Sequence, residues 1–246
     1  MINILIPMAG QDQFFKDTEY QYPKPLIEVC GKTIIEYVID NYNDIEKEKQ
    51  FIFIVNVDDC RKYNLDYTLQ RLVGNAKIIK LDGHTQGSAC SALMAIEYID
   101  SKVPLLIANS DQLFNNSITE LLNNFSKYDG GVITFDSVHP RWAYAKISDD
   151  DNVIEIAEKR PISRHALTGF FYFKHGEDFV NSAKDSIRKG GTTNDKYYIS
   201  TTINEMILRN KKIFAYKIEN KNYHTFYTPQ KIKDFDRRKK IQSDEI

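Results

Sequence analysis

Short apolar runs alternate with segments of helical period through the first half of the chain. The runs are continuous, which is typical of strands buried on both faces of a parallel sheet. Strands are therefore expected at Ile2–Pro7, Phe51–Val57, Ala76–Leu81 and Pro104–Asn109. Helices are expected over Thr33–Tyr42, from a cap at Asp58 or Asp59 to Leu72, and over Ser88–Ile99. This alternation predicts a Rossmann-like α/β fold with helices on both faces of a mixed, mostly parallel sheet.

The pattern changes after about residue 138, where the apolar runs become shorter and are joined by polar turns. Before this point, a helix is expected from Ser117 and a strand from Val132. Beyond it we expect strands of antiparallel or mixed pairing at Tyr144–Ser148, Val153–Ala157, Leu167–Phe173 and Lys212–Ile218. Further helices are expected over Phe179–Arg188, over Ile199–Arg209 and from Pro229. With no repeat or linker, the sequence predicts one domain over residues 1–236 and a charged, flexible tail over residues 237–246.

The loop after the first strand carries the first candidate chemistry. Met8, Ala9 and Gly10 form a small-residue turn, which lets backbone N–H groups approach a nucleotide closely. Lys24 follows between two prolines, so its backbone is restrained and its ammonium can be presented to a phosphate. A surface turn with a solvated lysine explains these residues equally well.

Two further motifs are expected at the same edge of the sheet. Asn109-Ser110-Asp111 follows a strand whose apolar run indicates a central position, and Asp111 there is a candidate Mg²⁺ ligand. A helix-capping or turn aspartate is the alternative. The turn containing Gln86, Gly87 and Ser88 opens a helix, where unpaired N–H groups and small side chains suit a base or a ribose. A plain helix cap explains Ser88 as well.

Composition narrows the classes of partner. With 33 basic and 34 acidic residues and a net charge of −1, the chain offers no bulk electrostatic attraction for nucleic acid or for an anionic membrane. Cys30, Cys60 and Cys90 are dispersed without metal-binding spacing and are interpreted as reduced thiols. We find no leader sequence and no apolar run long enough to span a bilayer, so a cytoplasmic protein is expected.

Taken together, these motifs resemble those of the sugar-phosphate nucleotidyltransferases, also called nucleotide-sugar pyrophosphorylases. The resemblance covers nearly the whole chain, and no single motif carries it. It rests on Ile4–Gly10, Pro23–Leu26, Gly31-Lys32, Gln86–Ala89, Asn109–Asp111, Ala157–Pro161, Thr168–Phe173, Tyr198–Ile207 and Thr228-Pro229. The fold that it implies is the nucleotide-diphospho-sugar transferase type, with a nucleotide-binding half over residues 1–137 and a sugar-phosphate-binding half over residues 138–236.

The resemblance implies a reaction in which a sugar phosphate attacks the α-phosphorus of an NTP and pyrophosphate leaves, with Mg²⁺ as cofactor. The product would be a nucleotide-activated sugar for capsule or other surface polysaccharide. Lys24 and Asp111 would be the catalytic residues, with Asp111 as the metal ligand. The nucleotide would contact Met8, Ala9, Gly10, Gln86, Gly87, Ser88 and Asn109. The sugar phosphate would contact Arg141, Glu158, Lys159 and Gly169.

The sequence departs from the family pattern at two places. Where the family has Gly-x-Gly-x-Arg, this chain reads Gly10-Gln11-Asp12-Gln13-Phe14-Phe15, so a second glycine and an arginine that would clamp phosphate are both missing. Asp12 would repel phosphate if it faced it. Near the C-terminus, the segment 223–229 lacks an aspartate that often supplies a second metal ligand. His224 either replaces that ligand or is a packed histidine, and the basic residues considered as compensation are Arg141, Lys146, Arg160 and Arg164.

Two other functions stay open at this point. One is a nucleotide- or sugar-binding relative with weakened catalysis, which the missing arginine suggests. The other is a glycosyltransferase that uses a nucleotide-sugar and takes Asp111 as its metal ligand. Lys24 between its prolines favours the nucleotidyltransferase, because a glycosyltransferase has no need of that element. The base, the sugar and the choice between monomer and homo-oligomer are left open.

Overall fold

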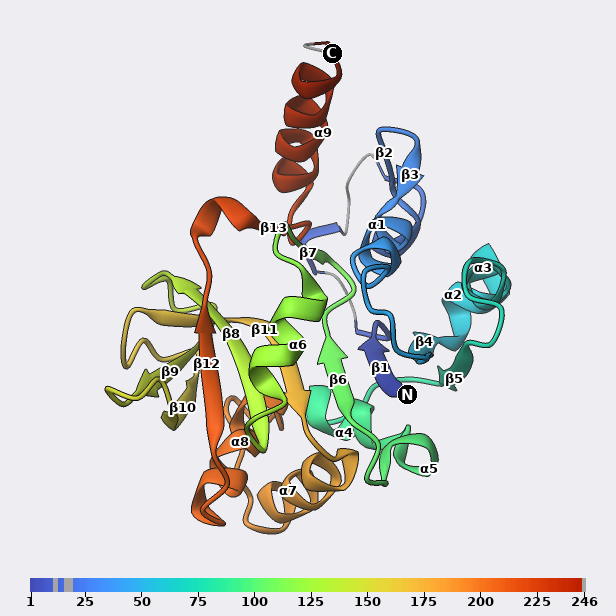
Figure 1. The fold of residues 1–246 in the computed structure, drawn as a ribbon. Coiled ribbons are helices and arrows are strands. Elements are labelled where there is room, and N and C mark those ends of the chain that lie inside the picture. Colours follow the sequence, from blue (N-terminus) through green and yellow to red (C-terminus); the bar gives the residue numbers. More distant parts are fainter. Residues whose placement is uncertain (11–12, 16–19, 245–246) are drawn as a thin grey trace.

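The computed structural model places one mixed sheet at the centre of the molecule (Figure 1). The structure describes residues 1–10, 13–15 and 20–244. The strands of this sheet are β1 (Ile2–Pro7), β4 (Lys49–Asn56), β5 (Lys77–Leu81), β6 (Leu105–Ala108), β8 (Gly130–Asp136), β9 (Ala143–Ile147), β10 (Val153–Glu158), β11 (His165–Phe173) and β12 (Ile213–Lys217). Their order is β10-β9-β11-β6-β1-β4-β5, with β8 pairing to β11 and β12 pairing to β8.

The N-terminal part of the sheet is parallel, as the continuous apolar runs predict. β1 pairs with β4 on one side and with β6 on the other, and β5 pairs with β4. Ile4 and Ile6 pack into the core on one face of the sheet, and Leu5 packs into the core on the other. Both faces therefore require apolar residues, which is why no polar alternation is present in β1.

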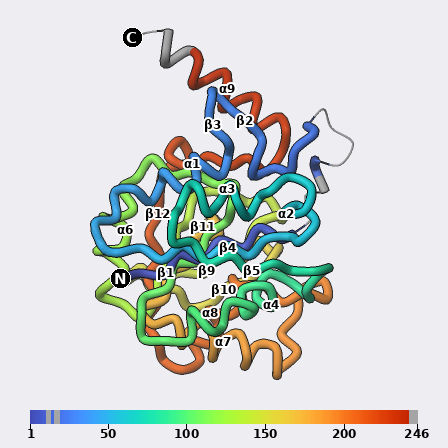
Figure 2. The backbone as a smooth tube through the Cα atoms, turned by 90° about the vertical axis from the view of Figure 1, so that its right-hand side faces the viewer, coloured from blue at the N-terminus to red at the C-terminus, as the bar shows by residue number. Residues whose placement is uncertain are grey.

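Helices cover the two faces in separate layers, which lie above and below the strands in Figure 2. The first layer contains α1 (Ile34–Asp40), α2 (Val57–Tyr63), α3 (Leu65–Leu72) and α6 (Ile118–Phe125). The second contains α4 (Ser88–Leu93), α5 (Ile96–Ile99), α7 (Gly176–Arg188) and α8 (Ile199–Leu208). The helix start expected at Ser117 is confirmed, since its side chain accepts a hydrogen bond from the backbone N–H three residues later, and Thr33 caps α1 in the same way.

Two predicted long helices are each divided. The cap expected at Asp58 or Asp59 is wrong, because α2 begins after Asn56, whose side chain accepts from the N–H of Asp58. α2 then ends at Asn64, which has a left-handed φ of 54° and separates it from α3. The helix expected over Ser88–Ile99 is interrupted at Met94 and Ala95. Asparagine tolerates the left-handed conformation better than most residues, and a periodicity argument does not detect such a break.

β11 joins the parallel part of the sheet to the antiparallel part. Its residues Phe170–Phe173 pair with β6, and Ala166 pairs with β9. Its pairing with β8 shifts register between Leu167 and Phe171. Gly169, inside this break, has a φ of +92°, a conformation that glycine adopts without steric cost. The mixed pairing predicted for the second half is thereby confirmed.

Short elements complete the fold. They are β2 (Glu28–Val29), β3 (Lys32–Thr33), β7 (Gln112–Phe114), β13 (Tyr223–Thr225), and the 3₁₀ turns η1 (Gln13–Phe15), η2 (Lys24–Leu26) and η3 (Asn220–Asn222). The antiparallel pairing of β7 with β13 was not predicted. It ties the segment after β6 to the C-terminal part of the chain.

The final helix, α9 (Pro229–Asp244), extends away from the sheet beside the β2–β3 hairpin (Figures 1 and 2). It continues through residues 237–244, where a frayed tail was expected. Asp236 and Lys240 form an ion pair one helical turn apart, 2.6 Å in length, which supports this extension. In the described part of the chain, no helix has both the length and the apolar character needed to cross a bilayer.

Candidate active site

A cavity of about 400 Å³ opens where β1 and β6 end. β1 lies between β6 and β4, so the direction of chain order changes at this point, which is where ligands bind in open α/β sheets. The two halves of the chain both contribute to its walls. The predicted site residues that line it are Met8, Gly10, Lys24, Ser88, Asn109, Asp111, Arg141, Glu158, Lys159 and Gly169.

Lys24 and Asp111 meet at the cavity although they are 87 residues apart in sequence. The Nζ of Lys24 donates to Oδ2 of Asp111 over 2.6 Å, and the two side chains are only 7% and 12% exposed. The turn η2 and the two prolines that flank Lys24 restrain its backbone. Asp111 is held by the end of β6 and by the backbone N–H of Phe226, which donates to the Asp111 carbonyl over 2.8 Å. The cavity therefore contains a rigidly placed pair of opposite charges.

Asp111 fits a Mg²⁺ site that substrate would complete. Mg²⁺ in proteins takes one or two carboxylates and fills the remaining positions with water and phosphate oxygens. Among the described residues, no three His, Cys, Asp or Glu side chains are grouped closely enough to enclose a metal ion. Asp111 as the one proposed carboxylate ligand suits a metal that arrives with a nucleotide better than one that is held permanently.

His224 is a packed histidine. The alternation along the segment that contains β13 brings Tyr223, Thr225 and Tyr227 to the cavity and leaves His224 out of its lining. The imidazole packs against the ring of Phe235, with centroids 5.7 Å apart. Burial lowers the pKa of His224, and the positive charges of Arg238 and Lys239 lower it further. The alternative of His224 as a replacement metal ligand is not supported by this arrangement.

Glu158 and Lys159 stand at the end of β10, on another wall of the cavity. Lys159 has a φ of +54°, and its Nζ donates to the Tyr198 hydroxyl over 2.8 Å. That hydrogen bond raises the pKa of Lys159. The Glu158 carboxylate accepts from the Ser200 hydroxyl over 2.6 Å. Burial raises the pKa of Glu158, and the Ser200 hydrogen bond partly opposes this effect.

Gly169 lies directly beside Asn109 in the wall of the cavity. A Cβ added at Gly169 would lie 2.2 Å from Nδ2 of Asn109, so no larger residue fits unless the amide moves. The Asn109 amide donates to the Thr168 carbonyl over 3.4 Å. The resemblance suggested that Gly169 leaves room for a sugar ring. In the structure, its immediate effect is to leave room for Asn109.

Arg141 extends over aromatic rings at the cavity. Its guanidinium carbon lies 4.5 Å from the centroid of the Trp142 ring and 5.3 Å from that of Tyr227. Trp142 also packs edge-on against Phe135, so it fills part of the core and supports Arg141 at the same time. The other basic residues considered as compensation, Lys146, Arg160 and Arg164, do not line the cavity.

Ser88 is the one residue of the predicted triplet Gln86–Ser88 found in the described lining of the cavity. Gln86 and Gly87 instead contact the segment before α8. The Gln86 carbonyl accepts from the N–H of Tyr197 over 2.8 Å, and a Cβ added at Gly87 would lie 2.3 Å from the Tyr197 carbonyl oxygen. This turn therefore fixes the position of Tyr198. Ala9 is buried in the core and does not line the cavity.

Several residues that line the cavity were not predicted. The segment 223–229, which was compared with the family pattern above, could have revealed some of them. Tyr223, Thr225 and Tyr227 alternate along the chain, and period-two spacing in an extended segment places such residues on one face. Tyr198 carries no comparable local signal, because Lys159 meets it from a distant part of the sequence. Gln11 and Asp12 of the altered loop lie outside the described residues.

Comparison with known proteins gives a consistent result. A family model described as nucleotidyl transferase matches residues 18–223. The bifunctional protein GlmU of Methanocaldococcus jannaschii is 25% identical over 176 residues, which is 70% of this chain. This chain spans 40% of that relative's length.

Solved structures show the same fold. The nucleoside-diphosphate-sugar pyrophosphorylase of Vibrio cholerae RC9 superposes with a TM-score of 0.84 at 24% identity, covering 95% of this chain and 99% of that one. The inositol-1-phosphate CTP transferase of T. maritima superposes with a TM-score of 0.73 at 13% identity, covering 94% and 91%. At these identities the similarity establishes the fold, and it confirms the architecture predicted from the sequence.

Proposed function

Because the chain belongs to the nucleotidyl transferase family, we propose that it condenses an NTP with a sugar phosphate, or a related phospho-compound, and releases pyrophosphate. The observation that carries this proposal is the meeting of Lys24 and Asp111 in a cavity that also contains Arg141 and Lys159. Anions must be gathered for phosphoryl transfer, and most of the catalytic advantage comes from positioning and neutralising them.

We assign residues 1–137 to the nucleotide and 138–236 to the acceptor. Met8, Gly10, Ser88 and Asn109 would contact the nucleotide, with Ala9, Gln86 and Gly87 shaping the turns that hold them. A Cβ added at Gly10 would meet no atom of the described residues within 4 Å, so there is room for a nucleotide to approach the backbone from that side. Glu158, Lys159 and Gly169 would form the acceptor site, together with Arg141 as the resemblance implies.

In the proposed reaction, an oxygen of the acceptor phosphate forms a bond to the α-phosphorus. The bond from that phosphorus to the bridging oxygen breaks, and pyrophosphate leaves with the electron pair. Lys24 offsets the negative charge of the triphosphate, and Lys159 holds the acceptor phosphate. Glu158 accepts hydrogen bonds from acceptor hydroxyls. Mg²⁺ held by Asp111 would further offset the phosphate charge when bound.

The arrangement of polar groups supports a hydroxylated acceptor. Glu158 and Ser200 offer hydrogen-bond partners for hydroxyl groups beside a lysine suited to phosphate, a combination that a polyhydroxylated phosphate such as a sugar phosphate satisfies. A nucleotide-activated sugar made in this way would serve glycosyl transfer, including the assembly of capsule or other surface polysaccharide. We place the reaction in the cytoplasm, where NTPs are available.

Release of pyrophosphate tests the proposal. Purified protein with Mg²⁺ is assayed with ATP, GTP, CTP, UTP and dTTP against sugar 1-phosphates and inositol 1-phosphate, with Asp111→Ala as the inactive control. We expect release with at least one pair and formation of the matching nucleotide-linked product. Nucleotide binding without release for every pair would identify a weakened binding relative instead. Transfer from a supplied nucleotide-sugar to a sugar acceptor would identify a glycosyltransferase.

A further inference from the structure

Arg141 differs from neighbouring arginines in having no carboxylate partner among the described residues. Arg160 pairs with Glu155 at 3.4 Å and Arg164 pairs with Asp136 at 2.7 Å, and neither lines the cavity. Lys24 lines the cavity but is paired with Asp111. The charge of Arg141 is therefore directed to the cavity without a counter-charge in the described part of the chain. A cation in this setting is prepared for an anionic ligand.

Aromatic rings hold the guanidinium without using its hydrogen-bonding capacity. The guanidinium lies over both Trp142 and Tyr227, at 4.5 Å and 5.3 Å from the ring centroids. Stacking occupies the faces of the planar group, whereas its N–H donors point outward along its edge. A phosphate can therefore accept from Arg141 while the stack remains in place.

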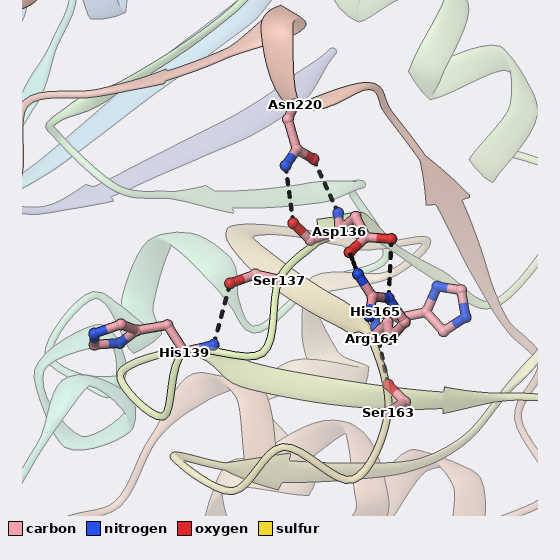
Figure 3. A network of polar contacts seen from close by, with 7 residues as sticks. All are labelled: Asp136, Ser137, His139, Ser163, Arg164, His165 and Asn220. Carbon is pink, nitrogen blue, oxygen red and sulfur yellow. Dashed lines mark hydrogen bonds and ion pairs between the residues drawn. The ribbon is translucent and has the colours of Figure 1, made fainter.

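The connection that carries Arg141 is fixed at its start by a polar network (Figure 3). Asn220 binds the backbone of Asp136 twice: its side chain donates to the carbonyl over 2.9 Å and accepts from the N–H over 3.1 Å. The Arg164 guanidinium donates to the Asp136 carboxylate over 2.7 Å. The Arg164 carbonyl accepts from the N–H of Ser137 over 3.1 Å. β8, β11 and η3 therefore meet at the point where this connection begins.

Further along, the connection binds to itself and to β9. The N–H of His139 donates to the Ser137 hydroxyl over 3.3 Å (Figure 3), and the N–H of Arg141 donates to Nδ1 of His139 over 3.3 Å. The buried Tyr144 donates its hydroxyl proton to the His139 carbonyl over 2.6 Å. Such preorganisation reduces the entropy that would otherwise be lost when Arg141 binds a ligand.

The same aromatic stack leads to the loop after β1. The ring of Phe14 lies 4.8 Å from the ring of Tyr227, on which Arg141 rests. Phe15, next in sequence, lies 5.9 Å from the Nζ of Lys24. The turn η1 is thus flanked by Lys24 on one side and by the stack that carries Arg141 on the other. Phe14 and Phe15 occupy the two positions at which the resembled family's loop arginine would be expected.

We infer that Arg141 binds the outer phosphates of the incoming triphosphate and then the leaving pyrophosphate. This inference rests on the proposed function and revises the expectation that Arg141 contacts the acceptor phosphate. Lys159, on a different wall and held by Tyr198, remains the group for the acceptor. The guanidinium missing from the loop after β1 is, in this view, supplied from the β8–β9 connection.

Binding of inorganic pyrophosphate with Mg²⁺, measured by calorimetry, tests Arg141 without requiring turnover. We expect Arg141→Ala to weaken pyrophosphate binding about tenfold or more, because a charge-assisted contact is lost. In the NTP assay its KM for the NTP should rise similarly, with the KM for the acceptor within about twofold of wild type. Arg141→Lys retains the charge but loses the planar stack, so an intermediate loss is expected. Arg160→Ala is the matched control and should leave pyrophosphate binding unchanged.

Three results would overturn the inference. These are unchanged pyrophosphate binding in Arg141→Ala, a loss confined to the acceptor KM, and full retention of pyrophosphate binding in both single variants Arg141→Lys and Tyr227→Leu. Thermal unfolding of each variant verifies that it is folded. If Arg141→Ala proves too unstable to measure, the result for Arg141→Lys decides the question. If wild-type protein binds pyrophosphate through Arg141 but releases none from any pair, the proposed function fails while this inference stands.

Discussion

The cavity has cations of two kinds, and they are held in opposite ways. Lys24 is buried and balanced by the carboxylate of Asp111, whereas Arg141 and Lys159 are supported by aromatic residues and have no carboxylate partner within the described chain. A buried ion pair depends on both partners, because either charge alone is costly in a site with little water. An aromatic ring carries no net charge, so a cation that rests on it can still pair with an anionic ligand. Mutation of the Lys24–Asp111 pair should therefore lower both the free energy of unfolding and activity, whereas mutation of Arg141 or Lys159 should mainly weaken ligand binding.

The largest effect is expected at the ion pair. Lys24→Ala and Asp111→Ala should each lower pyrophosphate release by about 10³-fold, since each removes charge placed at the reacting phosphates. Each should also lower the free energy of unfolding by about 3 kcal/mol, because the remaining charge is left unpaired. Urea unfolding and a pyrophosphate-release assay measure the two quantities.

A double substitution separates these effects. Lys24→Met combined with Asp111→Leu removes both charges and should be less destabilised than the sum of the single variants, while release stays abolished. Additive losses of stability would show that the two residues act independently. The contrast between the ion-paired Lys24 and the cations supported by aromatic rings would then be unfounded.

Lys159 should show the reverse pattern. Lys159→Gly removes the ammonium and also relieves a left-handed backbone (φ +54°). We expect the acceptor KM to rise about tenfold, while the free energy of unfolding is unchanged or higher by up to about 1 kcal/mol. Steady-state kinetics and urea unfolding measure this split. Lys159→Ala is the control: it should lose acceptor affinity equally, without the gain in stability.

Gly10 tests the nucleotide side of the cavity without disturbing the ion pair. A Cβ at this position meets no atom of the described part of the chain within 4 Å, and the backbone φ is not left-handed, so the free energy of unfolding of Gly10→Ala should change by less than about 0.5 kcal/mol. Its KM for the NTP should rise about fivefold, because the methyl group occupies space that the nucleotide needs. Gly74→Ala, equally open but away from the cavity, should change neither quantity. An unaltered KM in Gly10→Ala would remove Gly10 from the nucleotide site.

The smallest effect is expected at Glu158. Because burial raises its pKa above the ordinary value of 4.5, the folded protein holds this proton more tightly than the unfolded chain. Stability from this group is therefore lost as pH rises from the ordinary range through the raised value. Glu158→Gln should be more stable than wild type at pH 7 by up to about 1 kcal/mol, and the difference should vanish below about pH 4. Thermal unfolding across this pH range measures it, and a pH-independent difference would contradict the assignment to Glu158.

The strands were predictable because burial on both faces imposes continuous apolar sequence. β1, β4 and β6 lie within one or two residues of their expected bounds. The breaks within helices were not predictable, since a single left-handed residue such as Asn64 does not disturb hydrophobic periodicity. The β7–β13 pair was missed because three-residue strands contain too little pattern, and their pairing joins distant parts of the chain.

For the site, the sequence revealed which residues carry charge but gave no information on how they are held. Lys24, Asp111, Arg141 and Lys159 were all expected, and all line the cavity. Their partners depend on tertiary packing: Asp111 for Lys24, Tyr227 for Arg141 and Tyr198 for Lys159. Local spacing does not encode contacts between residues that lie dozens of positions apart.

The position of β11 has a consequence for motion. This strand pairs with β6 on the nucleotide side and with β8 and β9 on the acceptor side. A hinge between the two sides would break the hydrogen-bond ladder of a buried strand, unlike the domain closure of proteins whose halves are joined by linkers. We therefore expect any closure over substrates at the rim of the cavity, where Tyr227 contacts Phe14 on one side and supports Arg141 of the β8–β9 connection on the other. The central sheet is therefore expected to keep its shape when a ligand binds in the cavity.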